Sequence, residues 1–430
     1  MKDLRTEKSA LLSSPWFPVD NAANLYAAAR KKKWCRTLRM AAILNEEVNS
    51  EVLQEALIEV AKRFPSFSAK LRDGFFWSYF ERTTAEPKLL EEKAYPYRPI
   101  RLEGTNQPNF RVLYYKNRVT VEAFHALADG GACARFLSSL LTRYYEILGE
   151  EIEKNELALR VEDDPTESET SDDYVKNSVP SLKGNKVKSP KVYYKKYKAK
   201  KNYARLTHGI MKVDDVKAAA AKYSVTITEY LSSALIYTII KTTKKPIEKD
   251  ISISIPVDLR RRFDSESVRN FSYMKGINFN PGKMTDFELS EICAQVDGQI
   301  HAKTSANRLL TDISSNVNAQ QSPFLKPIPY ALKRVFLKGS YKKSQTMFSL
   351  FLSNYGEFNA PKEILSHIQR TEFILGDTPY MPFGCAAISV NGILNFSFSS
   401  SNSDMEFQKT FFRLLAEDGV PVRIESNICE

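Results

Sequence analysis

Residues 125–131 read His-Ala-Leu-Ala-Asp-Gly-Gly, and they lie where the pattern of the chain changes from strand to helix. Before them, Val119, Val121 and Ala123 alternate with other residues, as in a strand that ends at His125. The chain has only four histidines. Because imidazole has an ordinary pKa of about 6.5, it can accept a proton near neutral pH. His125 is therefore the candidate base of a site at the end of this strand.

Asp129, four residues after the histidine, has three candidate roles. It could hydrogen-bond the ring of His125, as in a Ser-His-Asp triad, or it could pair with an arginine and hold the loop. It could also cap a helix that begins at Gly130. Gly130 and Gly131 leave room for a ligand to approach the backbone and permit the turn into the helix. For His125 itself, a structural role at a strand end fits the residues as well as a catalytic role does.

The composition is that of an ordinary globular protein. Of 430 residues, 43% are hydrophobic and 26% are charged, and the length suits two domains or one duplicated domain of about 150 residues per unit. The five cysteines are far apart, without a C-x-x-C motif or neighbouring histidines, so neither a metal site nor a disulfide framework is expected. Without a signal-peptide pattern or a long apolar run, the chain is predicted to be cytoplasmic, with no integral membrane segment.

The net charge of +11 is unevenly distributed. Residues 150–173 are rich in Asp and Glu, whereas residues 183–201 are rich in lysine and include three tyrosines. Basic and aromatic residues together are typical of nucleic-acid-binding surfaces. Because the adjacent acidic block would partly cancel the positive field, we interpret the lysine-rich segment as a solvated connection and expect no nucleic-acid partner.

The chain divides at this connection into two halves that each mix helices and strands. The predicted boundaries are 1–165 for the first half, 166–204 for the linker and 205–430 for the second half. The first half has helical patterns at 52–64 and 131–148, an aromatic strand-like run at 75–80 and a hairpin at 110–124. The second half has helices at 213–222, 228–240 and 404–417, strands at 251–255, 347–353 and 420–424, and a hairpin at 386–398. The turn of that hairpin is Asn391-Gly392, both of which tolerate a positive φ. Two such halves predict a duplicated α+β fold with a ligand site between them.

His125-x-x-x-Asp129-Gly130 resembles the H-x-x-x-D-G motif of the chloramphenicol acetyltransferase-like superfamily. This superfamily includes plant BAHD acyltransferases, nonribosomal peptide condensation domains, wax ester synthases and alcohol acetyltransferases. Residues 255–260 are similar to the strand whose arginine pairs with the motif aspartate, and Asn270-Phe271 follows at a familiar distance. Residues 353–356, Ser-Asn-Tyr-Gly, lie where relatives carry a glycine-containing motif near the active-site tunnel. The resemblance covers nearly the whole chain and is greatest to bacterial alcohol acetyltransferase-like proteins.

This resemblance implies an α+β fold, an α/β sandwich, of two chloramphenicol acetyltransferase-like subdomains that form a pseudo-dimer with a tunnel between them. It implies a monomeric acyltransferase that moves an acyl group from a thioester to an alcohol or, less commonly, an amine. Acyl-CoA would be a co-substrate, with no permanently bound cofactor, and the acceptor would be a small molecule or a lipid. The acceptor would attack directly, through a tetrahedral oxyanion and without a covalent intermediate.

The resemblance also implies roles for single residues. His125 would be the general base, and Asp129, together with Gly130, would form a structural brace with Arg260. Strand alternation would place Asp258, Arg260 and Arg262 on the face opposite the isoleucines of the same strand. Arg262 is then the second candidate partner, and a surface position is the alternative for each arginine.

The residues that stabilise the oxyanion are not specified by a motif. Ser353 and Asn354 are the candidates for an oxyanion-binding or tunnel role, and a turn is their alternative. No metal is expected at this site.

Two departures from the superfamily keep alternatives open. The chain has a single histidine in Phe124-His125, where condensation domains usually have two in tandem, and the Asp-Phe-Gly-Trp-Gly motif of the plant enzymes is absent. The first alternative is a condensation-type domain that takes acyl groups from an acyl carrier protein. The second is a non-catalytic relative that binds acyl chains or lipids. Lysines of 183–201 could attract the phosphates of coenzyme A or an acidic carrier protein.

Overall fold

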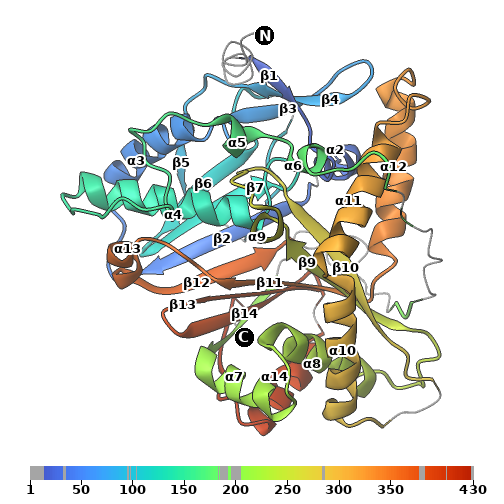
Figure 1. Cartoon of the computed structure of the whole chain (residues 1–430). Coiled ribbons are helices and arrows are strands. Elements are labelled where there is room, and N and C mark those ends of the chain that lie inside the picture. Colours follow the sequence, from blue (N-terminus) through green and yellow to red (C-terminus); the bar gives the residue numbers. More distant parts are fainter. Residues whose placement is uncertain are drawn as a thin grey trace.

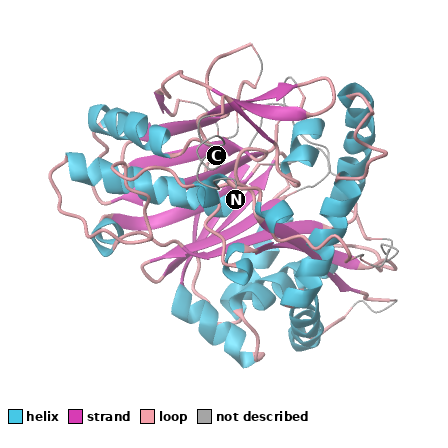
Figure 2. Cartoon of the chain, turned by 45° about the horizontal axis from the view of Figure 1, so that its top comes forward, coloured by secondary structure: helices cyan, strands magenta, loops and turns pink. Residues whose placement is uncertain are grey.

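The computed structural model describes residues 14–31, 35–93, 96, 98–102, 104–182, 184, 192–194, 205–282, 286–376, 383–402 and 404–427. Within these residues the strands form sheets of five, seven and three strands (Figure 1). The sheets run through the middle of the molecule and the helices lie around them (Figure 2). This is the mixed α+β architecture that the sequence predicts.

The five-stranded sheet carries the strand that leads to His125. Its order is β12 (Ile368–Leu375), β2 (Thr37–Leu44), β7 (Arg118–Phe124), β6 (Phe110–Tyr115) and β5 (Leu89–Glu91). The helices α3 (Ser50–Arg63) and α4 (Gly130–Ile147) pack against one another and against this sheet. Their inward residues recur at helical spacing, and Asn49 caps α3 by accepting hydrogen bonds from the backbone of residues 51 and 52. The predicted helices at 52–64 and 131–148 and the hairpin at 110–124 are confirmed.

The seven-stranded sheet belongs to the second half of the chain. Its order is β10 (Ser272–Phe279), β9 (Ile251–Asp258), β11 (Leu350–Glu357), β13 (Gly384–Val390), β14 (Ile393–Ser400), β8 (Arg205–Lys212) and β15 (Arg423–Ser426). Four helices pack on it and on one another: α7 (Val213–Lys222), α8 (Ile227–Lys241), α10 (Leu289–Lys303) and α14 (Glu406–Glu417). Asn391 and Gly392 have φ values of 49° and 74° in the β13–β14 turn, as the sequence predicts.

The remaining elements surround the two larger sheets. The three-stranded sheet has the order β1 (Trp16–Pro18), β4 (Ser78–Arg82) and β3 (Ala69–Asp73). The other helices are α2 (Ala23–Ala29), α5 (Glu167–Thr170), α6 (Asp173–Lys176), α9 (Arg260–Phe263), α11 (Ala306–Gln320), α12 (Tyr330–Gln345) and α13 (Lys362–Ser366). Among the described residues, no helix is both long and apolar enough to span a membrane.

The second half contributes a strand to the sheet of the first half. β12 pairs with β2 in antiparallel register, with Phe373 opposite Met40. The hydrophobic core of the first half accordingly includes residues from β11, β12 and β13. The two halves therefore share one core in addition to the separate core under α7, α8, α10 and α14. This shared core fixes the position of β7 relative to β9 and β11.

Two local predictions were wrong. Residues 75–77 are not strand but the turn between β3 and β4, because the backbone N–H of Gly74 donates to the carbonyl of Trp77 at 2.8 Å and closes the hairpin there. The strand at 251–255 is not half-buried, because β9 lies between β10 and β11 and its serines are buried as well as its isoleucines. The predicted linker is partly helical, since α5 and α6 lie within 166–182, and Glu169 of α5 forms a buried ion pair with Arg63 at 2.6 Å. Most of the lysine-rich segment 183–201 lies outside the described residues.

Candidate active site

The motif occupies the connection from β7 to α4. His125 follows the last residue of β7, and its backbone N–H donates to the carbonyl of Arg36 at 2.8 Å. Asp129 is the N-cap of α4, and its side chain accepts a hydrogen bond from the backbone N–H of Ala132 at 3.0 Å. The predicted change from strand to helix is therefore confirmed, and one of the three roles considered for Asp129, the helix cap, is present.

The imidazole of His125 is half-buried and stacks on the ring of Tyr26, with centroids 4.1 Å apart and an interplanar angle of 14°. Burial disfavours the charged ring and the guanidinium of Arg36 repels it, and together they lower the pKa of His125 to about 4. Its own backbone carbonyl, Asp129 and Asn270 favour the protonated ring and offset this only in part. At neutral pH the ring is therefore uncharged and can accept a proton.

Asp129 forms a bidentate ion pair with Arg260. Nη2 of Arg260 lies 2.9 Å from Oδ1, and Nη1 lies 3.1 Å from Oδ2. Oδ2 also accepts a hydrogen bond from the backbone N–H of Phe271 at 2.8 Å. The positive charge of Arg260 and these hydrogen bonds outweigh burial and hold the pKa of Asp129 below its usual value. No hydrogen bond joins Asp129 to the His125 ring in the described part of the chain, so the carboxylate serves as cap and arginine partner.

Arg260 is held by several groups besides Asp129. Its Nε donates to the carbonyl of Ser267 at 2.7 Å, and Nη1 donates to Asp258 at 3.0 Å. The strand-alternation argument for this residue was wrong, because β9 ends at Asp258 and Arg260 begins the short helix α9. Arg262, the second candidate, is exposed and makes no ion pair among the described residues. The helical turn, not the strand pleat, points Arg260 at Asp129.

The two glycines of the motif differ in what surrounds them. A Cβ on Gly131 would lie 2.8 Å from Nη1 and 3.2 Å from Cζ of Arg260, whereas a Cβ on Gly130 would lie 3.3 Å from the ring of Phe373. Neither glycine has a positive φ. The space that we expected to admit a ligand at Gly131 is thus filled by the guanidinium of Arg260, and the turn into α4 does not require glycine geometry.

This difference predicts that Gly131→Ala destabilises the protein more than Gly130→Ala does. The methyl group at 131 must displace a guanidinium fixed by several hydrogen bonds, a clash of the kind that costs about 1–3 kcal/mol. At 130 the ring of Phe373 needs to move by only a few tenths of an ångström. The comparison is made by chemical unfolding of the two variants and the parent. Equal stability of the two variants would contradict the assigned contact.

No role for Asn270 follows from the sequence alone, and the structure places it beside the motif. Its amide nitrogen donates to Asp20 and to the carbonyl of Ala126, both at 3.1 Å, and the side chain is buried. Its carboxamide favours the protonated form of His125, as an acceptor oxygen directed at the ring would. Asp20 itself is fully buried, and burial raises its pKa to about 7. Asn270 thus connects the motif, through hydrogen bonds, to the segment that precedes α2.

Arg36 is a site residue that sequence reasoning missed. It is buried, its Nη1 donates to the carbonyl of Gly376 at 3.0 Å, and its guanidinium lies 5.7 Å from the ring centroid of Phe351. No ion pair to Arg36 is found within the described residues. A buried cation beside a neutral imidazole can stabilise negative charge that develops on a nearby oxygen. Arg36 lies just before β2 and belongs to no recognisable sequence motif. Its proximity to His125 becomes apparent only from the pairing of β2 with β7.

Ser353 and Asn354 face opposite sides of β11. Phe351 belongs to the shared core and Leu352 to the core of the second half, so Ser353 lies on the face of Phe351 and Arg36. The amide nitrogen of Asn354 donates to the hydroxyl of Thr228, in the first turn of α8, at 2.9 Å, and the amide oxygen accepts the backbone N–H of Gly356. Neither residue is hydrogen-bonded to His125 in the part of the chain that the structure describes. The hydrogen bond from Gly356 to Asn354 is local, as expected if Asn354 has the turn role that was its alternative.

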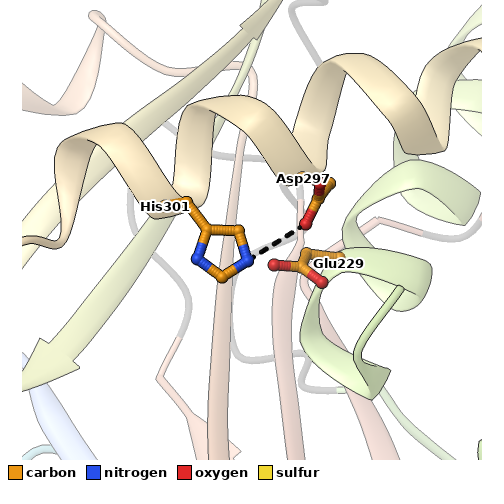
Figure 3. Close-up of side chains that lie close together, drawn as sticks. All are labelled: Glu229, Asp297 and His301. Carbon is orange, nitrogen blue, oxygen red and sulfur yellow. Dashed lines mark ion pairs between the residues drawn. The ribbon is translucent and has the colours of Figure 1, made fainter. Parts of the chain in front are cut away.

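A second cluster of polar residues lies on the helices of the second half (Figure 3). Glu229 of α8 and Asp297 and His301 of α10 have potential metal-ligating atoms that all lie within 4.8 Å of one another. His301 and Asp297 form an ion pair at 3.2 Å, and Glu229 accepts the backbone N–H of Thr226 in a capping box. These contacts account for the cluster as a helix cap and an (i, i+4) pair.

No family model matches the sequence, and no curated protein matches it. Among solved structures, TRI101 from F. graminearum in complex with coenzyme A and deoxynivalenol matches with a TM-score of 0.63 and 11% identity, over 95% of this chain and 100% of that chain.

Two further structures show the breadth of the match. TRI3 trichothecene 15-O-acetyltransferase from Fusarium sporotrichioides has a TM-score of 0.60 and 12% identity, over 93% of each chain. The EpoB NRPS cyclization-docking bidomain from Sorangium cellulosum has a TM-score of 0.56 and 12% identity, over 94% of this chain and 84% of that chain. At such identities the likeness concerns the fold. The chain therefore has the mixed α+β fold of these two acetyltransferases and of the cyclization-docking bidomain.

Proposed function

We propose that this protein is an acyltransferase that moves an acyl group from a thioester to a hydroxyl or, less often, an amine. The observation that carries the proposal is the neutral, half-buried imidazole of His125 next to the buried guanidinium of Arg36. The fold supports it, because one structural neighbour is an O-acetyltransferase and another holds coenzyme A. Acyl-CoA is accordingly the proposed donor, as a co-substrate.

In the proposed reaction, His125 takes the proton from the acceptor as its oxygen or nitrogen attacks the thioester carbonyl carbon. The new bond forms while the carbonyl electrons move to oxygen, and the positive charge of Arg36 stabilises the resulting oxyanion. The oxyanion then collapses, the carbon–sulfur bond breaks, and the imidazolium returns the proton to the thiolate. Between these two proton transfers, Asn270 and Asp129 stabilise the imidazolium of His125. No enzyme nucleophile takes part, and Asp129 and Arg260, with Gly130, act as the structural brace of the motif.

The pH dependence of the reaction follows from the lowered pKa of His125. A base with a pKa of about 4 is present above that value and is lost as the pH falls through it, whereas an ordinary histidine would be lost near pH 6.5. We therefore expect kcat/KM to change little between about pH 8 and 6 and to fall by half near pH 4. The measurement is a pH–rate profile, with tryptophan fluorescence recorded at each pH to verify that the fold persists.

The variant Arg36→Gln serves as the control for that profile. Removing the positive charge should move the inflection of kcat/KM towards pH 6.5, in addition to lowering the rate. An inflection near pH 6.5 in the parent protein, or an inflection that Arg36→Gln leaves unchanged, would contradict the electrostatic account of His125.

The experiment that tests the function is product analysis by mass spectrometry. Alcohols and amines are incubated with short- and long-chain acyl-CoAs, and an acceptor mass increased by the acyl group is the expected result. The condensation-type alternative is supported by the EpoB neighbour, and it predicts a higher rate from acyl carrier protein than from acyl-CoA. A non-catalytic lipid-binding protein would release no free thiol above background from either donor.

Other parts of the proposal concern the protein as a whole. We propose a monomer located in the cytoplasm, with a small-molecule or lipid acceptor that enters between the two halves. Residues 1–165 and 205–430 are the proposed subdomains, joined by 166–204.

Ser353 lies on the same face of β11 as Phe351 and is the proposed polar group of the tunnel. Asn354 is less suited to bind an oxyanion or a ligand there, because its amide nitrogen already donates to Thr228.

A further inference from the structure

The helix α12 carries an apolar stripe that faces outward. Leu332, Val335 and Phe336 are 64%, 71% and 71% exposed, and their spacing of three and four residues places them on one face. Tyr330 and Tyr341 of the same helix are buried. A surface helix normally turns its apolar face to the core. In α12, three large apolar side chains are instead exposed on the outer face.

Two neighbouring segments extend this stripe. The β3–β4 turn exposes Phe75, Phe76 and Trp77, and it lies beside the start of α12 (Figure 1). The backbone N–H of Tyr330 donates to the carbonyl of Phe75 at 2.7 Å, and Lys333 Nζ donates to the carbonyl of Phe76 at 2.9 Å. The segment before α12 adds two further exposed residues. We call these eight residues the apolar surface: Phe75, Phe76, Trp77, Phe324, Leu325, Leu332, Val335 and Phe336.

The charge around the apolar surface is predominantly positive. Residues 313–356 contain no Asp or Glu. The same stretch contains six basic residues: Lys326, Lys333, Arg334, Lys338, Lys342 and Lys343. Asp73, the nearby carboxylate at the end of β3, is already shared by Arg30 at 2.8 Å and Arg334 at 3.5 Å. The surface therefore combines aromatic and aliphatic side chains with an uncompensated positive charge.

We propose that the apolar surface docks the protein onto a bilayer that contains anionic phospholipids. Exposed Trp, Phe and Leu can enter the boundary between headgroups and acyl chains, while lysines beside them attract anionic headgroups. Patches of exposed apolar residues on this scale are uncommon on proteins that meet only water. The lysines would also attract an acidic partner protein. However, Trp77 and the exposed phenylalanines come from three separate segments, and such a surface fits a deformable apolar phase better than the fixed surface of a protein.

The same helix joins the apolar surface to the candidate active site. On the inner side of α12, the ring of Tyr341 lies 6.3 Å from that of Tyr26, and Tyr26 stacks on His125. The helices α2 and α12 pack together along this contact. If the proposed acyl transfer holds, the bilayer would lie one helix away from the reacting groups. This arrangement favours donors or acceptors that partition into lipid, and that part of the inference rests on the proposed function.

The test is flotation of the purified chain with vesicles. Phosphatidylcholine vesicles with and without about 30% phosphatidylglycerol are compared at about 0.1 M and 0.5 M salt. The higher salt concentration should screen the attraction between the lysines and the anionic headgroups. We expect binding to the anionic vesicles that decreases at high salt. Val335→Asp/Phe336→Asp should abolish it, and Lys342→Glu/Lys343→Glu should reduce the bound fraction by about tenfold or more. Leu157→Asp, at an exposed apolar residue outside the apolar surface, is the matched control and should bind as the parent does.

Each other outcome overturns the inference. Absence of binding to anionic vesicles excludes the bilayer, and so does equal binding of Val335→Asp/Phe336→Asp and parent. A parent dimer in sedimentation that Val335→Asp/Phe336→Asp makes monomeric, without vesicle binding, would assign the apolar surface to a second copy of the chain. Acyl transfer to a small alcohol from acetyl-CoA is measured without vesicles for every variant and should not change. Failure of docking and failure of the proposed function are thereby distinguished.

Discussion

Replacing His125 by alanine is expected to lower turnover by about 10²–10⁴-fold. The variant lacks the group that accepts the proton from the acceptor, and the charge of Arg36 cannot replace it. Turnover is measured as free thiol released from the acyl donor, with an acceptor already verified by product mass. The change removes the stacking on Tyr26 and the contact with the Asn270 carboxamide, but the ring is only half-buried, so the fold should persist.

The control for this prediction is His301→Ala. His301 is exposed on α10, where it pairs only with Asp297 in the described part of the chain, so its loss should leave turnover unchanged. Both variants should melt near the parent temperature. If His125→Ala turns over at a rate close to that of the parent, His125 is not the base, and the proposed mechanism fails.

Replacing Asp129 by alanine is expected to lower the free energy of unfolding by about 3–5 kcal/mol, and activity with it. The change leaves the buried guanidinium of Arg260 without its bidentate partner and deprives the backbone N–H groups of Ala132 and Phe271 of their acceptor. Unfolding in urea, analysed by linear extrapolation, measures the difference. Arg260→Ala should have an effect of similar size, because it leaves the Asp129 carboxylate buried and unpaired.

The double variant and a neighbouring arginine provide the controls. Asp129→Ala/Arg260→Ala should be less destabilised than the sum of the single variants, because residues in direct contact are not additive. Arg261→Ala, at an exposed position of the same helix, should unfold like the parent. Additive single effects, or single variants as stable as Arg261→Ala, would show that the ion pair contributes nothing to the fold.

Local patterns predicted those parts of the molecule whose contacts are local. The helix α4 follows from its apolar spacing and its Asp129 cap, and the β13–β14 turn follows from Asn391-Gly392. The ion pair of Asp129 with Arg260 was also expected, although the strand-alternation argument offered for it was wrong. The resemblance named the partner, but strand alternation could not, because the chain leaves β9 after Asp258 and turns into α9.

The rest depends on contacts between distant segments. Arg36, Tyr26 and Asn270 come from three separate parts of the chain and meet only when β2 pairs with β7 and the second half packs against the first. The exchange of β12 into the first sheet is likewise a long-range pairing without a local signal. In α12 the usual assumption that apolar residues face the core would have reversed the orientation of Phe336.

The central claim is that His125 moves the proton in acyl transfer from a thioester, and one measurement tests it most directly. Acylated product, by mass spectrometry, and free thiol are quantified in the same reaction for the parent and for His125→Ala. The account predicts equal molar amounts of product and thiol, dependence of both on the acceptor, and a loss of both by the same factor of about 10²–10⁴ in the variant. Thiol released without acylated product, or equal yields from parent and variant, would contradict it.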